Sequence, residues 1–303
     1  MYRKNDSLPE LDLSFGREIG RGATSTVYRL ADGTVCKLFN PEFSIEEILR
    51  ESHAAESAYA LGIRVPKPYG PVRAEGRTGI RSEYLEGETL ADVLRKDPGQ
   101  RERILPAYIR ELKRFHKTSA DTAELFRAKD LYLEKIEKLR GAEWYTEEEL
   151  EKMRQLVLSV PERSTLILGD YHPKNILVKN GELFFVDLGD MCLGHPVFDF
   201  AMIANTHYII PGMNPAYAEK YFAVPPGLML TLWDDVFTGC FSGFSNKKQD
   251  EIKKEIMAFA VLRQGLSPAD GRVFSKQVLS GNVAAARKRL LPDIENITGS
   301  IDW

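Results

Sequence analysis

Residues 168–175 read LGDYHPKN, and the interpretation of the whole chain starts from this segment. It lies between two apolar, β-rich runs, TLIL at 165–168 and LFFV at 183–186, and it carries Asp170 and Asn175 five residues apart. A hydroxyl group that attacks a phosphate needs a neighbour that orients it and accepts its proton, and a carboxylate can do both. The Asn175 side chain offers a carbonyl oxygen to Mg²⁺, which prefers oxygen ligands and shares them with phosphates.

A second carboxylate, Asp187, comes twelve residues after Asn175, where the LFFV run ends. Between the two runs, the pair Asn180-Gly181 predicts a hairpin turn. Together Asp170, Asn175 and Asp187 are the groups that phosphoryl transfer with Mg²⁺ requires. The alternative interpretation is that Asp170 and Asn175 are ordinary turn residues, because both types form local hydrogen bonds in loops.

The segment resembles the catalytic loop of the aminoglycoside phosphotransferase and choline kinase family, which reads HGDxHxxN. The resemblance implies that Asp170 is the catalytic base and that Asn175 and Asp187 are the ligands of Mg²⁺. Leu168 departs from the pattern, since the family has His there, and we expect the hydrogen bond of that His to be lost or replaced by packing. His172 either touches the transferred phosphate or a metal-bound water, or only braces the loop.

Downstream, GHPVFD at residues 194–199 resembles the family's run after the metal aspartate. This resemblance implies that Asp199 supports the catalytic loop from the start of a helix. Lys174 is expected to be a solvated loop residue.

The amino-terminal part carries a second pattern in the order that a kinase-like fold needs. Residues 20–27, GRGATSTV, fit the kinase pattern GxGxxGxV with a serine in place of the third glycine, so that backbone N–H groups can approach phosphates closely. A glycine pair also marks plain hairpins. The nucleotide contacts predicted in this segment are Gly20, Gly22, Ser25 and Val27.

Lys37, in the strand-like run after this loop, is predicted to pair with the α and β phosphates and to be held by a glutamate of the next helix. Glu47, Glu51 and Glu56 all lie on that helix. The spacing to Val65-Pro66, which resembles a family landmark, favours Glu51 and leaves Glu56 in reserve. Lys37 is otherwise an ordinary strand lysine with an exposed amine.

The run Ser82-Glu83-Tyr84-Leu85-Glu86-Gly87 resembles the family's hinge, whose backbone groups contact adenine. The cofactor-binding residues predicted there are Glu83 and Leu85. The resemblance implies ATP and Mg²⁺ as cofactors, bound between two lobes.

Hydrophobic periodicity predicts an α+β fold, and the resemblance makes it a bilobal, protein-kinase-like one. We expect residues 1–86 to form a nucleotide-binding lobe, a small antiparallel sheet with one helix, and residues 87–303 to form a mainly helical lobe with the catalytic loop, metal site and acceptor site. The predicted helices lie at 42–61, 89–96, 101–118, 122–140 and 146–159, and then run in pieces from Val197 to Leu290 with breaks at Pro211, Pro225, Ser245 and Pro268.

Composition limits the partners. The chain has 303 residues and a formal net charge of −3, without the Lys/Arg block that follows a nucleic-acid backbone. It has three widely spaced cysteines, which fit neither a disulfide framework nor a metal site. No apolar run is long enough to span a membrane, and together with the cysteine count this leads us to expect a cytoplasmic protein that does not bind a membrane. We expect no nucleic-acid partner, and the sequence leaves open whether the protein is a monomer or a homodimer.

The expected reaction is transfer of the ATP γ-phosphate to a hydroxyl of a small aminoglycoside-, choline- or sugar-like acceptor, and an antibiotic acceptor would make the protein a resistance enzyme. The mixed-charge run from Glu134 to Arg154, which includes Glu147-Glu148-Glu149, is either an acidic wall for a cationic acceptor or a solvated helix face. The rival functions are a nucleotide-binding pseudokinase, favoured by Leu168 and Ser25, and a protein kinase.

Overall fold

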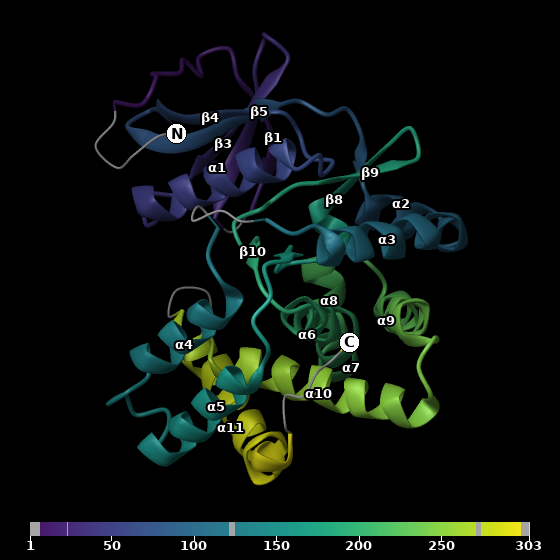
Figure 1. The fold of residues 1–303 in the computed structure, drawn as a ribbon. Helices are drawn as coiled ribbons and strands as arrows, with labels where there is room; N and C mark the ends of the chain where they lie inside the picture. Colours follow the sequence, from purple (N-terminus) through teal and green to yellow (C-terminus); the bar gives the residue numbers. More distant parts are fainter. Residues whose placement is uncertain (1–6, 23, 121–124, 271–273, 298–302) are drawn as a thin grey trace. The chain divides into compact units, whose positions relative to one another are not determined.

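The computed structural model describes residues 7–22, 24–120, 125–270, 274–297 and 303 (Figure 1). The chain divides into two compact units. The first comprises Met1–Val93, Thr122–Leu125 and Pro173–Met191, and the second comprises Leu94–Asp121, Phe126–His172 and Cys192–Trp303. The predicted lobe division after residue 86 stays a prediction.

A five-stranded antiparallel sheet with the order β1-β2-β3-β5-β4 builds the first unit. Its strands are β1 Arg17–Arg21, β2 Ser25–Arg29, β3 Thr34–Phe39, β4 Pro68–Ala74 and β5 Arg77–Glu83. Along β3, Cys36 and Leu38 are fully buried in the apolar core of the sheet. Because side chains alternate along a strand, Lys37 points to the opposite face.

One helix, α1 Ile45–Ala60, packs against β4 and β5 (Figure 1). It begins at Ser44, whose hydroxyl accepts the Glu47 N–H while the Glu47 carboxylate accepts the Ser44 N–H, a capping box that satisfies two orphan donors. It ends before Gly62, which has a left-handed φ of 72°. The predicted sheet with a single helix on it is confirmed.

The first unit also holds the hairpin of β8 Ile176–Lys179 and β9 Glu182–Phe185, with the two-residue β6 Glu88–Thr89 paired to β8. The turn residues Asn180 and Gly181 have φ values of 52° and 78°, as a two-residue hairpin turn requires. The predicted hairpin is therefore confirmed. The TLIL run is not part of it, because β7 Leu166–Ile167 pairs with β10 Cys192–Leu193 in the second unit.

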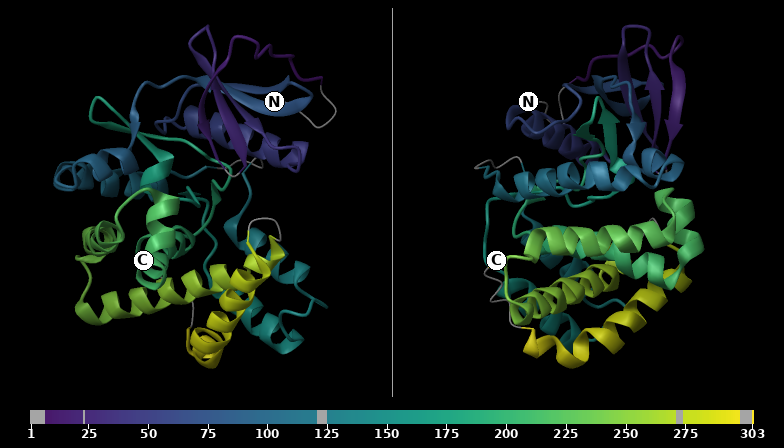
Figure 2. Two further views of the ribbon diagram at one scale, coloured as in Figure 1. Left: turned by 180° about the vertical axis from the view of Figure 1, so that it is seen from behind. Right: turned by 90° about the vertical axis from the view of Figure 1, so that its right-hand side faces the viewer.

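The second unit is mainly helical, and its centre is α6 Val197–Ala204, which is buried along almost its whole length. α10 Asn246–Gly265 packs against α6 on one side and α11 Lys276–Arg289 on the other (Figure 2). The remaining helices are α3 Gln100–Lys117, α4 Ala128–Lys138, α5 Glu147–Ser159, α7 Ile210–Met213, α8 Pro215–Phe222 and α9 Pro226–Phe241, while α2 Leu90–Lys96 spans the division between the units.

The predicted break at Pro211 is wrong. The helix continues from α6 through a π-helical stretch, Asn205–Ile209, into α7, and it ends at Asn214 instead. A proline ring normally collides with the carbonyl one α-turn earlier, and the wider π turn just before Pro211 makes room for it. The predicted breaks at Pro225, Ser245 and Pro268 fall between helices, as expected.

The predicted α+β class is confirmed by the antiparallel sheet and the helical remainder of the chain. Residues 122–124 of the predicted helix at 122–140 lie outside the described residues, and α4, Ala128–Lys138, lies within the remainder. Among the helices of the described ranges, none combines the length and the apolar composition that crossing a bilayer demands.

Candidate phosphotransfer site

Lys37 connects two carboxylates in the first unit. Its Nζ lies 2.7 Å from Glu51 Oε1 and 2.8 Å from Asp187 Oδ1. The Lys37 and Glu51 side chains are 19% and 12% exposed, whereas that of Asp187 is 49% exposed. The amine therefore sits between an interior anion on α1 and a surface anion just beyond β9.

The geometry distinguishes among the glutamates of α1. Glu47 is used in the capping box of Ser44, and Glu56 Oε1 lies 3.4 Å from the Ser52 hydroxyl. Glu51 contacts Lys37 directly, at 2.7 Å. Gly189 makes room for this pair, because a Cβ at that position would lie 3.1 Å from Glu51 Oε2.

The electrostatics of the cluster favour an added cation. Burial lowers the pKa of Lys37, but the Glu51 and Asp187 carboxylates outweigh it and hold that pKa above its ordinary value. Burial raises the pKa of Glu51, and the negative charges of Asp187 and Asp190 raise it further. The Lys37 ammonium lowers the pKa of Glu51 but does not outweigh these effects, so that it remains above its usual range. One ammonium among three carboxylates leaves a surplus of negative charge, which a divalent cation at Asp187 would offset.

Asn175 and Asp187, the predicted metal ligands, are tied together by the backbone. Asn175 lies in a 3₁₀ turn, Pro173–Asn175, and its carbonyl oxygen accepts the N–H of Val186 at 3.0 Å. Asp187 follows directly, with a left-handed φ of 61° that is uncommon for a residue other than glycine.

The donor set fits Mg²⁺. The described residues hold no group of three or more His, Cys, Asp or Glu side chains that would bind a metal without help. Mg²⁺ sites of nucleotide enzymes use one or two side-chain oxygens and take the other ligands from phosphate and water. Asn175 and Asp187 would supply the two protein oxygens, and the ion would screen phosphate charge.

Gly20 lies near the end of β1 and Gly22 in the turn that follows it. The Gly22 N–H donates to the Ser25 carbonyl at 2.9 Å, which closes the β1–β2 turn, and Gly20 lies opposite Val27. A Cβ on Gly20 or Gly22 would meet its nearest protein atom at 4.0 or 3.8 Å, so neighbouring protein atoms do not require glycine at either position. Ser25 is buried at the start of β2, and Ala23 lies outside the described residues.

The predicted adenine contacts differ in what their backbone has left to offer. The Glu83 N–H donates to the Lys67 carbonyl at 2.9 Å, so this donor is already used. Leu85 is buried, with 6% exposure. An adenine contact by the Glu83 N–H would therefore displace a bond of the sheet edge, and both contacts remain predictions.

In the second unit, Asp170 Oδ2 lies 3.2 Å from His172 Nε2. The Asp170 side chain is 23% exposed, whereas His172 is 3% exposed and packs edge-on against Phe222, with ring centroids 5.3 Å apart. His172 is therefore anchored in the interior beside the predicted base. Lys174 is exposed, as expected.

Asp199 holds the loop before Asp170. Its Oδ1 accepts the Gly169 N–H at 2.7 Å, its Oδ2 accepts the Leu168 N–H at 3.1 Å, and His116 Nε2 lies 2.9 Å from Oδ2. A carboxylate only accepts, so His116 is the donor. The Leu168 side chain is fully buried, so packing takes the place of the hydrogen bond that a histidine there would make.

Sequence reasoning missed His116 and a buried polar pair behind the loop, Tyr108 and His207. The Tyr108 hydroxyl lies 3.0 Å from His207 Nε2, and the Tyr108 carbonyl accepts the Tyr171 hydroxyl at 2.6 Å. Burial, together with nearby His172, lowers the pKa of His207 to about 3, so this ring is neutral at physiological pH. None of these residues is part of a local motif, and only the packing of distant helices brings them to the loop.

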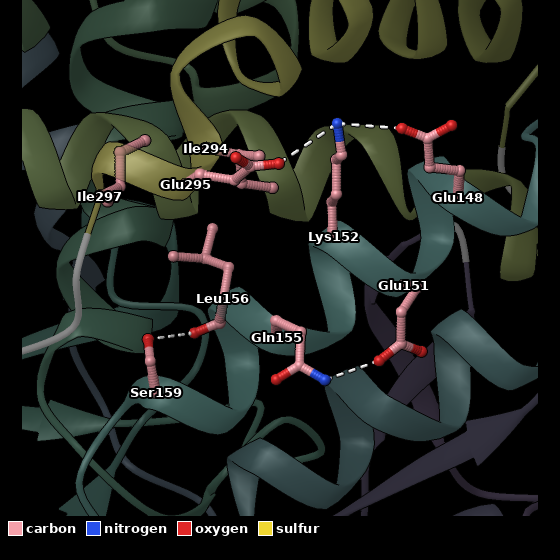
Figure 3. Close-up of a pocket in the computed structure, with 9 residues that line it drawn as sticks. All are labelled: Glu148, Glu151, Lys152, Gln155, Leu156, Ser159, Ile294, Glu295 and Ile297. Carbon is pink, nitrogen blue, oxygen red and sulfur yellow. Dashed lines mark hydrogen bonds and ion pairs between the residues drawn. The ribbon is translucent and has the colours of Figure 1, made fainter.

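The mixed-charge run at 134–154 is a helix surface whose carboxylates are paired with basic side chains, and it forms no open acidic wall. Lys152 lies 3.1 Å from Glu148 and 3.3 Å from Glu295, and Arg287 Nε lies 2.7 Å from Glu149 Oε1. Figure 3 shows Lys152 between its two carboxylates at the rim of a pocket of about 400 Å³. None of the predicted site residues lines this pocket, whose nine residues are Glu148, Glu151, Lys152, Gln155, Leu156, Ser159, Ile294, Glu295 and Ile297.

Comparison with known proteins gives a match to a family model and to solved structures. The family model described as the Phosphotransferase enzyme family matches residues 16–230, which is more than half of the chain and includes both motif regions. No curated protein matches the sequence.

Solved structures share the fold at low sequence identity. ADP-bound aminoglycoside phosphotransferase APH(2'')-Ib is 16% identical with a TM-score of 0.58, and the match covers 92% of this chain and 93% of that one. A choline/ethanolamine kinase family protein from Mesorhizobium loti is 14% identical with a TM-score of 0.58, and the match covers 90% of this chain and 87% of that one. An amicoumacin kinase in complex with AMP-PNP and Ca²⁺ is 17% identical with a TM-score of 0.56, and the match covers 96% of this chain and 91% of that one. The predicted protein-kinase-like fold class is thereby confirmed.

Proposed function

The chain belongs to the Phosphotransferase enzyme family, and on this premise we propose that it transfers the γ-phosphate of ATP, with Mg²⁺, to a hydroxyl group of a small molecule. The observation that carries the proposal is the contact of Lys37 with both Glu51 and Asp187. A lone strand lysine would be free in solvent, whereas this one is fixed by an interior anion on one side and a surface anion on the other. Such an amine is pre-positioned to meet phosphate oxygens.

The first unit would hold the nucleotide. Lys37, positioned by Glu51, would contact the α and β phosphates, and Asn175 and Asp187 would hold Mg²⁺. Gly20, Gly22, Ser25 and Val27 would lie over the phosphates, and Glu83 and Leu85 would contact adenine. We assign the nucleotide to a lobe of residues 1–86 and the acceptor to a lobe of residues 87–303.

Asp170 would orient the acceptor hydroxyl and take its proton. Catalysis then rests mainly on positioning and on neutralising phosphate charge, since little covalent chemistry is left to the protein. His172, within 3.2 Å of Asp170, would keep the carboxylate turned toward the acceptor.

A nucleotide-binding pseudokinase is the rival function. The carboxylate of Asp170, both metal ligands and the lysine pair are all present, which argues against it. The departure at Leu168 leaves the loop braced through its backbone amides. A protein kinase is less favoured, because only a short segment separates Asp187 from Asp199 and no long activation segment is present there.

A coupled assay of ADP release tests the proposal. The purified protein is screened with Mg-ATP over hydroxylated amines, sugars, antibiotics and a peptide mixture, with Asp170→Asn as the blank. Release above the blank with one class of small acceptor supports the proposal. Release with peptides alone identifies a protein kinase, and nucleotide binding without release for any acceptor identifies a pseudokinase.

A further inference from the structure

Three successive peptide groups before Asp170 are anchored to the helices behind them. The N–H groups of Leu168 and Gly169 donate to the two oxygens of Asp199, at 3.1 and 2.7 Å. The next group in line, the carbonyl of Gly169, accepts a hydrogen bond at 3.3 Å from Nη2 of Arg263, a residue of α10. The N–H groups of the loop are thus bonded to α6, and its Gly169 carbonyl is bonded to α10.

We propose that Arg263 is a positioning residue for Asp170, an inference that rests on the function proposed above. The Gly169 carbonyl and the Asp170 N–H belong to one planar peptide group. Fixing that oxygen therefore fixes the plane from which the Asp170 side chain projects. Gly169 itself has a left-handed φ of 79° and no side chain that packing can hold, so its orientation depends on these hydrogen bonds.

The replacement at Leu168 explains why this brace comes from a distant helix. A buried leucine side chain makes no hydrogen bond, so the segment carries no polar side chain of its own before Asp170. α10 packs directly on α6, and the residues just before Arg263, from Ala258 to Leu262, are all buried. The guanidinium thus extends from a rigid pair of helices, and a charge-assisted bond at a partly buried site is stronger than a neutral one in water.

The first test compares Arg263→Met with Arg263→Lys and with Lys254→Met, an exposed control on the same helix. Losing a charge-assisted hydrogen bond that orients the base is expected to lower kcat by about tenfold or more in Arg263→Met. The KM for Mg-ATP should stay within about twofold, because Lys37, Asn175 and Asp187 are untouched. Arg263→Lys keeps the charge and should recover part of kcat, while Lys254→Met should match the wild type.

A double-mutant cycle separates positioning from a merely structural role. If Arg263 acts through the Asp170 carboxylate, adding Arg263→Met to Asp170→Asn should not lower the residual turnover further. Effects that multiply, or an unchanged kcat in Arg263→Met, would overturn the inference. Should Arg263→Met lose its folded circular dichroism spectrum, Arg263→Gln, which stays polar but removes the charge and shortens the side chain, takes its place in the same cycle.

These outcomes are distinct from failure of the proposed function. A wild-type protein that transfers no phosphate, or an Asp170→Asn variant that keeps full turnover, contradicts the proposed function itself. An active wild type and an inactive Asp170→Asn variant, together with an unaffected Arg263→Met variant, contradict only the role of Arg263.

Discussion

Replacing Asp199 should lower the free energy of unfolding of the second unit far more than an ordinary surface substitution does. Its carboxylate is fully buried and accepts the N–H groups of Leu168 and Gly169 as well as His116 Nε2. Asp199→Ala leaves the two backbone donors without an acceptor in a site that water does not reach. Each such donor costs about 1–3 kcal/mol, which predicts a loss of about 2–6 kcal/mol in the free energy of unfolding.

Asp199→Asn should lose less, because an amide oxygen still accepts one or two of the three donors while its NH₂ group cannot accept the other. Urea titration followed by tryptophan fluorescence is suited to the measurement, since Trp144, Trp233 and Trp303 all belong to the second unit. Asp250→Ala, an exposed aspartate on α10, is the matched control. The expected loss is a large part of the total stability of a domain, which is about 5–15 kcal/mol. A loss below about 1 kcal/mol in Asp199→Ala would refute the reasoning, because it is smaller than the cost of a single unsatisfied donor.

Three further outcomes are expected. Lys37→Met should weaken Mg-ADP binding by about tenfold or more in calorimetry, since the phosphates lose a fixed cation, and unchanged affinity would remove Lys37 from the site. Asp187→Asn should raise the Mg²⁺ concentration for half-maximal activity by about tenfold or more, and an unaltered Mg²⁺ curve would exclude it as a ligand. The pKa of His207 is about 3 in the folded protein against an ordinary 6.5, so its contribution to stability is complete above pH 6.5 and is lost as the pH falls toward 3. From pH 7 to 5 this loss is about 2 kcal/mol in the free energy of unfolding. The His207→Gln variant should lack this loss. An equal dependence of the free energy of unfolding on pH in both proteins would contradict the assignment.

Local chemistry made much of the fold predictable. The Asn180-Gly181 pair, with left-handed φ at both residues, specifies its hairpin without help from the rest of the chain. The capping box of Ser44 and Glu47 at the start of α1 is a signal of the same kind, which the prediction of a helix from residue 42 did not use. Signals of this kind depend on residues next to one another, so a sequence displays them directly.

Tertiary packing determined what the sequence left open. TLIL resembles a hairpin strand by composition, yet it pairs with a two-residue strand after Asp187 that has no pattern of its own. Pro211 resembles a helix break, but a preceding π turn accommodates it. The spacing to Val65-Pro66 favoured Glu51 over Glu56, and the position of α1 against the sheet brings the Glu51 carboxylate to Lys37.

The same limit applies to the candidate site. Asp170, Asn175 and Asp187 were proposed as site residues because they lie in one short segment whose spacing fits a known chemistry. Arg263 reaches the loop from α10, and His116 reaches Asp199 from α3, and the spacing of either residue to Asp170 in the sequence carries no signal. Residues that position a catalytic group are held by the fold, and only a structure brings them into view.

The measurement that most directly tests the central claim is transfer of a labelled γ-phosphate from Mg-ATP to a small hydroxylated acceptor, with wild-type protein and the Asp170→Asn variant side by side. We expect label in the acceptor with the wild type and a reduction of about 10²-fold or more with the variant, while both bind Mg-ATP equally. Equal labelling by the two proteins, or nucleotide binding with no labelled product across the acceptor panel, would contradict the account.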